Sequence, residues 1–303
     1  MKKNTLTIGT RSSKLALIYA EKVKNELNKI FPNEIKLKKI VTTGDQKQDQ
    51  RLSDIGGKGL FAEQIEKELL NEDIDIAVHA LKDMPTIETE SLLTNNFLKR
   101  NSPNEILISK NNTKFEDLAP DSIIGTSSFR REFQLKKKRS DLKYKLIRGN
   151  VDTRIQKLEN GEFDAILLSK AGIDSLKLQN KITQEFSVDE LIPCAGQGII
   201  AIQCKKNDSD IIDLLEKIND IETRIVANAE REVLKVLEGD GDTAVGVFAK
   251  ITGENVDLVT ELFSVDGKMR YFIRETVKKD KIETASRMIG EKLKLQSKGS
   301  YKN

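Results

Sequence analysis

Apolar residues recur along the first half of the chain in two alternating patterns, which predict strands and helices in turn. A short apolar run at 6–9 is followed by apolar positions at helical spacing through residue 30, and the alternating segment 35–45 predicts a second strand. Residues 60–70 then predict an amphipathic helix, and residues 74–85 a buried strand. Strands that alternate with helices indicate an α/β sheet with helices on both faces.

The same order of elements returns later in the chain. The strand end Ile124-Gly125-Thr126 repeats Ile8-Gly9-Thr10, and a helix is again predicted behind it. Segments 71–78 and 160–167 correspond in the same way, since each leads into an apolar strand. We interpret the repeat as two similar α/β lobes, with chance similarity between βα units as the alternative.

The last third of the chain changes pattern. Residues 222–239 predict one long helix, short strands dominate residues 244–273, and a final helix is predicted at 283–295. This order indicates a small α+β domain. The expected division is a first lobe at 1–98 and 199–216, a second lobe at 104–193, and the α+β domain at 220–303.

Composition excludes several classes of site. The chain has 303 residues but only 1 histidine and 2 cysteines, so a histidine-rich zinc site and a disulfide framework are excluded and no metal site is expected. The thiols are typical of a reducing cytosol. The absence of tryptophan and the 5% aromatic content disfavour a base-stacking nucleic-acid surface. Neither a signal peptide nor a membrane span is predicted.

Local charge is more informative than the small net charge of +3. Residues 124–154 hold ten basic and three acidic side chains. Arg130 and Arg131 stand just inside a predicted helix start that carries Thr126, Ser127 and Ser128. Backbone N–H groups, hydroxyls and guanidinium groups at such a start suit a carboxylate or a phosphate.

Other arginines repeat this placement. Arg148 and Arg154 flank junctions between loops and elements, and Arg11 stands beside Ser13 at the first predicted helix. We therefore expect two facing anion sites with a ligand between the lobes. The run from Lys136 to Arg139 is expected to be a solvated basic face.

Lys82 and Asp83 are the best candidates for catalysis. They end the buried strand at 74–85, at the carboxyl tip where open α/β sheets bind ligands. An ionised aspartate there is able to stabilise a cation or to move a proton, whereas a turn salt bridge is the alternative. His79 lies inside the apolar run and is expected to be a core histidine.

Two glycine-rich motifs fail as nucleotide-binding signatures. Gly196-Gln197-Gly198 precedes a predicted strand rather than a helix, and Gly56-Gly57-Lys58-Gly59 lacks the P-loop spacing. We interpret the second motif as a flexible loop near the cleft, a lid with Phe61.

Several stretches together match a known family pattern. They are IGTRSSKLAL, VTTGD, GGKGLFAEQIEKEL, DIAVHALKDMP, IGTSSFRR, LIRGNVDTR, GEFDAILL and PCAGQGIIAIQC, followed by AEREVLKVLEGD and VGVFA. Over nearly its whole length the chain resembles the porphobilinogen deaminases, also called hydroxymethylbilane synthases.

The resemblance implies three domains, of which the first two are similar to the lobes of type II periplasmic binding proteins. It implies a cytoplasmic, monomeric transferase of heme biosynthesis. The family condenses four porphobilinogen molecules, releases ammonia and yields the linear tetrapyrrole hydroxymethylbilane. It starts from a dipyrromethane cofactor, which a thioether holds to a cysteine of the third domain.

Carried over by position, the resemblance makes Asp83 the catalytic aspartate and Phe61 an aromatic residue of a mobile loop over the site. Contacts with the carboxylate groups of cofactor and substrate fall on Arg11, Arg130, Arg131, Arg148 and Arg154, with Ser13, Lys82, Thr126 and Ser128 as accompanying polar contacts.

The third domain departs from the family at the attachment position, which falls on Gly241. Glycine forms no thioether, so covalent attachment of dipyrromethane there is in doubt. Neither Cys194 nor Cys204 is an obvious substitute, since both lie near or in an apolar strand outside this loop. Three explanations stay open: an inactivated enzyme, an enzyme that binds dipyrromethane non-covalently, and a non-catalytic protein that binds pyrroles or carboxylates.

Overall fold

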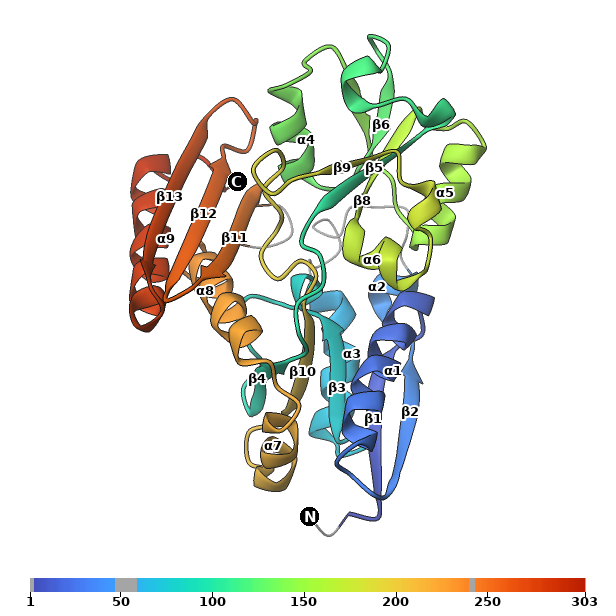
Figure 1. Ribbon diagram of the computed structural model, residues 1–303, viewed down its shortest axis with the longest axis vertical. Helices are drawn as coiled ribbons and strands as arrows, with labels where there is room; N and C mark the ends of the chain where they lie inside the picture. Colours follow the sequence, from blue (N-terminus) through green and yellow to red (C-terminus); the bar gives the residue numbers. More distant parts are fainter. Residues whose placement is uncertain (1–2, 47–58, 240–242, 303) are drawn as a thin grey trace.

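The chain folds into two α/β lobes and a third domain. The computed structural model describes residues 3–46, 59–239 and 243–302, so Gly241 and residues 56–58 of the glycine-rich loop lie outside the described residues. Figure 1 shows the first lobe mainly in blue and cyan, the second in green, and the third domain in orange and red. None of the described helices has the length and hydrophobicity needed to cross a bilayer.

The first lobe is built on a five-stranded sheet in the order β2-β1-β3-β10-β4. Its strands are β1 (Thr5–Arg11), β2 (Glu34–Ile40), β3 (Ile76–Ala80), β4 (Leu92–Phe97) and β10 (Ile200–Lys205). Its helices are α1 (Lys14–Asn28), α2 (Thr43–Gln46), α3 (Gly59–Leu70) and α7 (Ser209–Glu216). β1 runs parallel to β2 and β3, whereas β10 runs antiparallel between β3 and β4.

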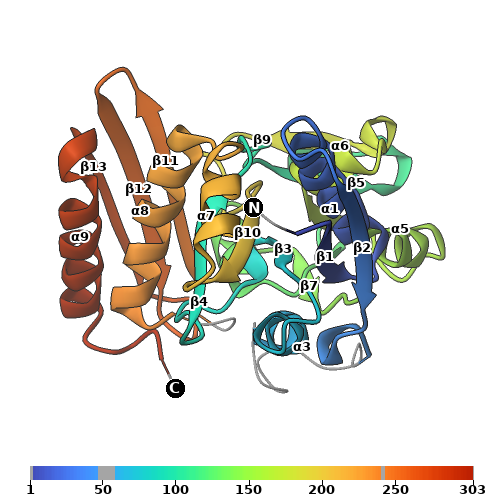
Figure 2. The same ribbon diagram turned by 90° about the horizontal axis from the view of Figure 1, so that it is seen from below.

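Successive side chains of β3 enter opposite faces of this sheet. Val78 packs in the core that contains residues of α1 and α7, whereas Ala77 packs with Ile65 of α3 in a separate core. Figure 2 shows α1 and α3 on opposite sides of the strands. The prediction of helices on both faces is therefore confirmed.

The second lobe repeats this plan, as the internal sequence match predicts. Its sheet has the order β7-β6-β8-β5-β9, with β6 parallel to both neighbours and β5 antiparallel between β8 and β9. Its strands are β5 (Glu105–Ser109), β6 (Ile123–Gly125), β7 (Lys143–Lys145), β8 (Ala165–Ser169) and β9 (Gln184–Phe186). Its helices are α4 (Phe129–Lys136), α5 (Val151–Glu159) and α6 (Lys170–Ser175).

The third domain packs two long helices with an antiparallel sheet of order β11-β12-β13. Its elements are α8 (Ile221–Leu237), β11 (Val245–Thr252), β12 (Asn255–Phe263), β13 (Arg270–Lys278) and α9 (Ile282–Ser297). Val233 of α8, Leu258 of β12 and Ile289 of α9 share one buried core. The small α+β domain predicted from the sequence is thus present.

Two crossover segments, 98–104 and 187–199, join the lobes and lie against each other. Asn101 N donates to Gly198 O at 2.8 Å, and Arg100 Nε donates to Gln197 O at 3.0 Å. Gly198 has a φ of +81°, and a Cβ there would lie 2.6 Å from Asn101 O. The motif around Gln197 is therefore a close backbone contact between the crossovers.

This contact predicts that Gly198→Ala destabilises the protein strongly. The variant combines an unfavourable positive φ with a clash against rigid backbone, so we expect a loss of about 2–4 kcal/mol in the free energy of unfolding. Gly253→Ala is the matched control, because Gly253 has a φ of +59° but nothing within 4 Å of an added Cβ. Equal losses in urea denaturation would contradict the close-contact explanation.

Candidate active site

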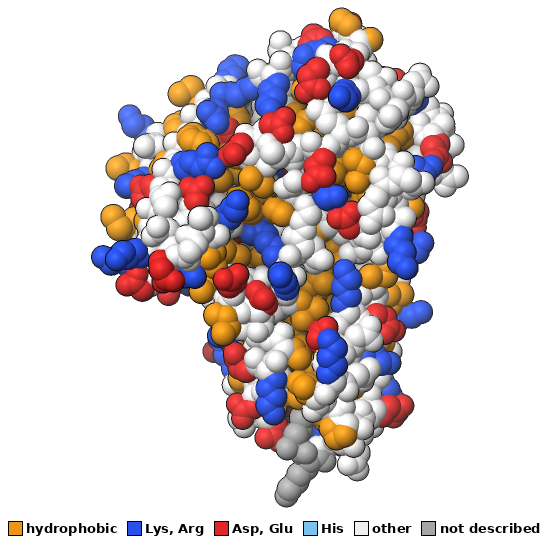
Figure 3. Space-filling model, viewed as in Figure 1, with side chains coloured by type: hydrophobic (Ala, Val, Ile, Leu, Met, Phe, Trp, Pro, Cys, Tyr) orange, Lys and Arg blue, Asp and Glu red, His pale blue; other side chains and the backbone are white. Residues whose placement is uncertain are grey.

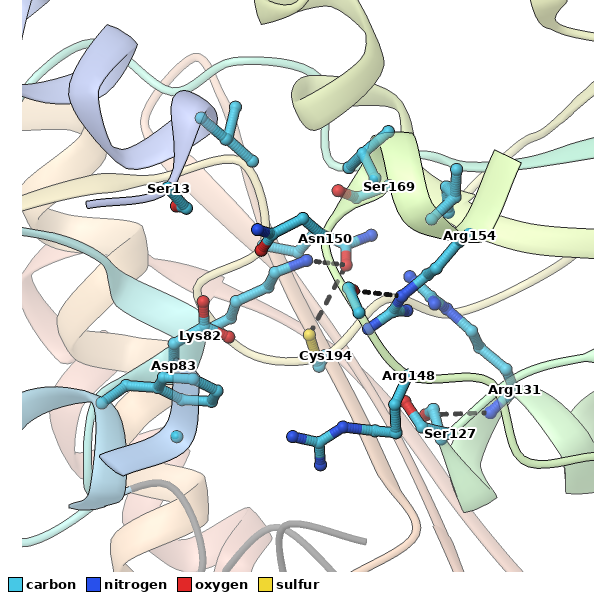
Figure 4. Close-up of a pocket in the computed structure, with 18 of the residues that line it drawn as sticks. Ser13, Lys82, Asp83, Ser127, Arg131, Arg148, Asn150, Arg154, Ser169 and Cys194 are labelled. Carbon is cyan, nitrogen blue, oxygen red and sulfur yellow. Dashed lines mark hydrogen bonds between the residues drawn. The ribbon is translucent and has the colours of Figure 1, made fainter. Parts of the chain in front are cut away.

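A cavity of about 350 Å³ lies where the two lobes and the third domain meet. Figure 4 shows Lys82 and Asp83 on one wall and Arg131, Arg148 and Arg154 on the other. The third domain contributes α8 and the start of β11 to the lining. The fold therefore gathers into one space residues that are far apart in the sequence.

The first lobe presents a cation above an aromatic ring. Arg11 ends β1, and its guanidinium carbon lies 3.8 Å from the ring centroid of Phe61. Ser13 caps α1 by accepting the Ala16 N–H at 3.3 Å. Phe61 belongs to the first turn of α3 and lines the cavity, while most of the glycine-rich loop before it lies outside the described residues.

Asp83 is positioned by the packing of its neighbours. It ends a 3₁₀ turn, Leu81–Asp83, that follows β3 directly. Leu81 and Met84 on either side are buried in the core of the third domain. The carboxylate itself remains 38% exposed, with Oδ2 at 4.0 Å from Arg11 Nη1. An acid on a fixed backbone thus faces the open cavity.

His79 lies behind this acid and takes no place in the cavity lining. The side chain is buried in β3, and burial lowers its pKa to about 4. The imidazole is therefore neutral at physiological pH, which confirms the expectation of a core histidine.

Arg130 and Arg131 begin α4 and share one buried acid. Arg130 Nη2 donates to one oxygen of Glu105 at 2.6 Å, and Arg131 Nη2 donates to the other at 2.7 Å. Burial alone would raise the pKa of Glu105, but Arg131 and Arg130 lower it to about 2. Ser128 caps this helix by accepting the Arg131 N–H at 3.4 Å.

Arg148 and Arg154, which also line the cavity, lie close to other positively charged arginines. Burial, and then the charges of Arg131 and Arg148, lower the pKa of Arg154 to about 10. Burial and then Arg11 lower the pKa of Arg148. Both pKa values are therefore depressed first by burial and then by the positive charge that the cavity concentrates.

The charge of the cavity is unbalanced in favour of an anionic ligand. Among the described residues that line it, seven are lysine or arginine and two are aspartate. On the outer face seen in Figure 3, by contrast, basic and acidic side chains are interspersed. The basic cluster predicted from the sequence is therefore partly an internal feature of the cleft.

Two sequence expectations need correction. Thr126 does not line the cavity: it is buried at the end of β6, and its hydroxyl accepts the Ser128 N–H at 3.2 Å. Arg139 is not part of a solvated face, because its guanidinium donates to the carbonyl oxygens of Glu116 and Leu118 at 2.7 and 2.8 Å. Lys136, Lys137 and Lys138 are exposed as expected.

Sequence reasoning missed three residues of this region. Glu105 gave no local signal, because it stands alone on β5 and meets its arginines only in the fold. Ser169 lines the cavity at the end of β8. Gln197 lies within a glycine motif whose sequence suggests only a failed nucleotide-binding signature, yet its Oε1 accepts from Lys82 Nζ at 3.5 Å.

Comparison with known families decides the relationship. Residues 6–213 match the family model described as porphobilinogen deaminase, dipyromethane cofactor binding domain, and residues 225–296 match the porphobilinogen deaminase C-terminal domain. The chain belongs to the porphobilinogen deaminase family. The family resemblance stated from the sequence motifs is thereby confirmed.

Relatives of this family match most of the chain. The porphobilinogen deaminase of Exiguobacterium sibiricum is 43% identical over 274 residues, covering 89% of each chain. That of Bacillus subtilis is 40% identical over 276 residues, covering 90% of this chain and 87% of its own. These matches do not favour the alternative of a non-catalytic homologue.

Solved binding proteins also align with part of the chain. A periplasmic binding protein with high arginine specificity from Salmonella typhimurium aligns with a TM-score of 0.43 and 14% identity, covering 71% of this chain and 92% of its own. An ancestral arginine-binding protein aligns with a TM-score of 0.40 and 18% identity, covering 72% and 92%.

The cavity suits the carboxylate groups of a dipyrromethane but not its thioether at position 241. Arg131 Nε is a buried donor with no acceptor among the described residues, and it belongs to the basic lining. A ligand carboxylate would supply such an acceptor. Gly241, in contrast, has no side chain to form a covalent bond.

The shared acid predicts that Glu105→Gln destabilises the second lobe. The variant leaves two buried guanidinium groups without their counter-charge, so we expect a loss of roughly 3–5 kcal/mol at pH 7. Because the folded pKa of about 2 lies below the ordinary 4.5, this contribution is present above pH 4.5 and is lost as the pH falls toward 2. Urea denaturation across that range measures it.

The matched control for this prediction is Glu132→Gln. Glu132 pairs with the half-exposed Lys136 on the surface of α4, so its loss is expected to change stability by less than about 1 kcal/mol. The difference in the free energy of unfolding between wild type and Glu105→Gln is expected to become smaller as the pH falls. A difference that stays constant would contradict the assigned role of Glu105.

Proposed function

We propose that this chain is a hydroxymethylbilane synthase, which joins four porphobilinogen molecules into a linear tetrapyrrole and releases ammonia. The observation that carries the proposal is the excess of positive charge opposite Asp83 in one cavity. Porphobilinogen carries an acetate and a propionate group on its pyrrole ring and an aminomethyl group as its reactive end. The carboxylate groups suit the wall that carries the arginines, and the aminomethyl group suits the wall that carries Asp83.

The arginines bind the substrate in this proposal. Arg11, Arg148 and Arg154 hold carboxylate groups. An anionic ligand supplies the counter-charge that buried Arg148 and Arg154 lack, since burial and then repulsion from neighbouring arginines depress their pKa values. Arg130 and Arg131 give part of their donors to Glu105, so they orient the wall and leave Arg131 Nε for a ligand. Ser13, Lys82 and Ser128 supply polar contacts around these cations.

Asp83 promotes the loss of ammonia. Departure of the amine leaves positive charge on the pyrrole methylene group, and a carboxylate in a fixed position stabilises that charge without reorganisation. The burial of Leu81 and Met84 provides this fixed position. Asp83 is also able to accept the pyrrole N–H as a hydrogen bond while the bond to nitrogen breaks.

A bound dipyrromethane would supply the acceptor pyrrole to which substrate units are added. The arginines would hold its carboxylate groups. The position that corresponds to the family's attachment cysteine is Gly241, and Phe61 acts as a lid residue over the ligand from the first turn of α3. In this proposal the enzyme works as a monomer in the cytoplasm, with the domain limits given from the sequence.

Incubation with porphobilinogen tests this function. We expect release of ammonia and formation of a linear tetrapyrrole, both measured by mass spectrometry and colorimetric assay. The rate is expected to rise in Gly241→Cys if position 241 is the family's attachment point. Absence of tetrapyrrole from both proteins would reject the proposed function.

The role of Asp83 predicts that Asp83→Asn lowers turnover by about 10²–10⁴-fold, because the amide is neutral at the point where positive charge develops. Binding of porphobilinogen, measured by calorimetry, is expected to survive, since the arginines are unchanged. Asp121→Asn is the control, because Asp121 is an exposed loop residue outside the cavity lining. A near-normal rate for Asp83→Asn would remove Asp83 from the mechanism.

A further inference from the structure

One thiol of the chain lies inside the cavity that holds the arginines. Cys194 belongs to the second crossover segment, and its side chain lines the cavity together with Lys82 and Thr243. Figure 4 shows its sulfur between Lys82 and Arg148. The sequence places Cys194 outside the predicted attachment loop, and only the fold brings it to the cleft.

The thiol is held beside positive charge. Cys194 Sγ donates to Gln197 Oε1 at 3.6 Å, and Lys82 Nζ donates to the same oxygen at 3.5 Å. Gln197 is fully buried, and its Nε2 donates to a crossover carbonyl at 2.7 Å, which fixes the shared acceptor. Although burial opposes it, the pKa of Arg130 is raised by Glu105 and then by Cys194. Cationic surroundings are those in which cysteines act as nucleophiles.

The other thiol provides an internal comparison. Cys204 lies in β10 with 1% of its surface exposed, and burial raises its pKa to about 12. A thiol buried among apolar side chains is inert. Since the chain has 2 cysteines, Cys194 is the candidate for thiol chemistry.

A separate observation indicates an anionic ligand in the same cavity. The Arg131 side chain is 8% exposed, and its Nε has no acceptor among the described residues. A buried donor of this kind is costly unless a ligand completes it. Because Arg131 and Cys194 line the same cavity, a carboxylate ligand bound at Arg131 would share its space with the Cys194 sulfur.

We propose that Cys194 is a covalent anchor for pyrrole units in this protein. The proposal rests on the proposed function, because it needs an aminomethylpyrrole in the cavity. A bond forms between the sulfur and the aminomethyl carbon, and the bond between that carbon and nitrogen breaks. The thiol proton leaves with the amine, so the products are a thioether and ammonia, and no oxidant or reductant is required.

The position of Cys194 suits this chemistry in two respects. Asp83, which promotes the loss of ammonia, lines the same cavity, so the amine departs where the sulfur approaches. Thr243, the first described residue after the predicted attachment position, lines it as well. Cys194 and Thr243 therefore reach one space from two different segments.

The test is intact-mass spectrometry of the full chain after incubation with porphobilinogen, followed by peptide mapping. We expect a mass increase by whole pyrrole units on the peptide that contains Cys194. We also expect Cys194 to lose its alkylation by iodoacetamide. Cys194→Ser, which keeps a donor for Gln197, is expected to carry no adduct, whereas Cys204→Ala is expected to carry it at the wild-type level.

Adduct and turnover report on different claims. Tetrapyrrole without a covalent adduct keeps the proposed function and overturns the role of Cys194, as does an adduct that maps to another residue. An adduct on Cys194 without tetrapyrrole supports the anchor and contradicts the proposed function.

Adding Gly241→Cys to Cys194→Ser is expected to restore an adduct at position 241. That result attributes the loss in Cys194→Ser to the missing thiol, whereas no restored adduct would attribute it to a damaged cavity and overturn the anchor.

Discussion

The cleft depends on the burial of several guanidinium groups close together, and Glu105 is the residue that makes this possible. One carboxylate accepts hydrogen bonds through both oxygens and holds Arg130 and Arg131 at the start of α4. Neither guanidinium group is exposed enough for water to solvate its charge. Arg148 and Arg154 then lie beside a wall that is already charged, and their pKa values are lowered. Glu105 therefore balances only part of the positive charge in this lobe, and Arg131 Nε keeps no acceptor among the described residues.

The third domain completes the site by packing rather than by charge. Its core takes in Leu81 and Met84, and Arg231 of α8 donates to Pro85 O at 3.0 Å, so the segment that carries Asp83 is fixed from behind. Thr86 Oγ1 also donates to Gly239 O at 2.7 Å. The acid is therefore rigidly placed, while the arginines that face it come from another lobe. Movement of the lobes about the crossovers would change the distance between acid and arginines.

Cys194 reaches the cavity only through the three-dimensional path of the second crossover segment. Cys194 stands beside a motif whose glycines allow two crossover backbones to approach each other. That close approach turns Gln197 and Cys194 toward Lys82. The backbone contact made at Gly198 thereby helps to place Cys194 in the lining of the cavity.

Local patterns in the sequence specify the order of elements, the repeat of the lobes and most of the charged residues that line the cavity. These features depend on local rules: periodicity marks strands and helices, and residues at strand tips and helix starts meet at the open edge of a sheet. Arg11, Asp83, Arg148 and Arg154 were found in this way. Tertiary structure alone decided the pairing of Glu105 with two arginines, the burial of Thr126 and the place of Cys194. The reason is physical: each of these depends on contacts between segments distant in the chain, and the energy of burying a charge or exposing a thiol is set by neighbours that no local pattern specifies.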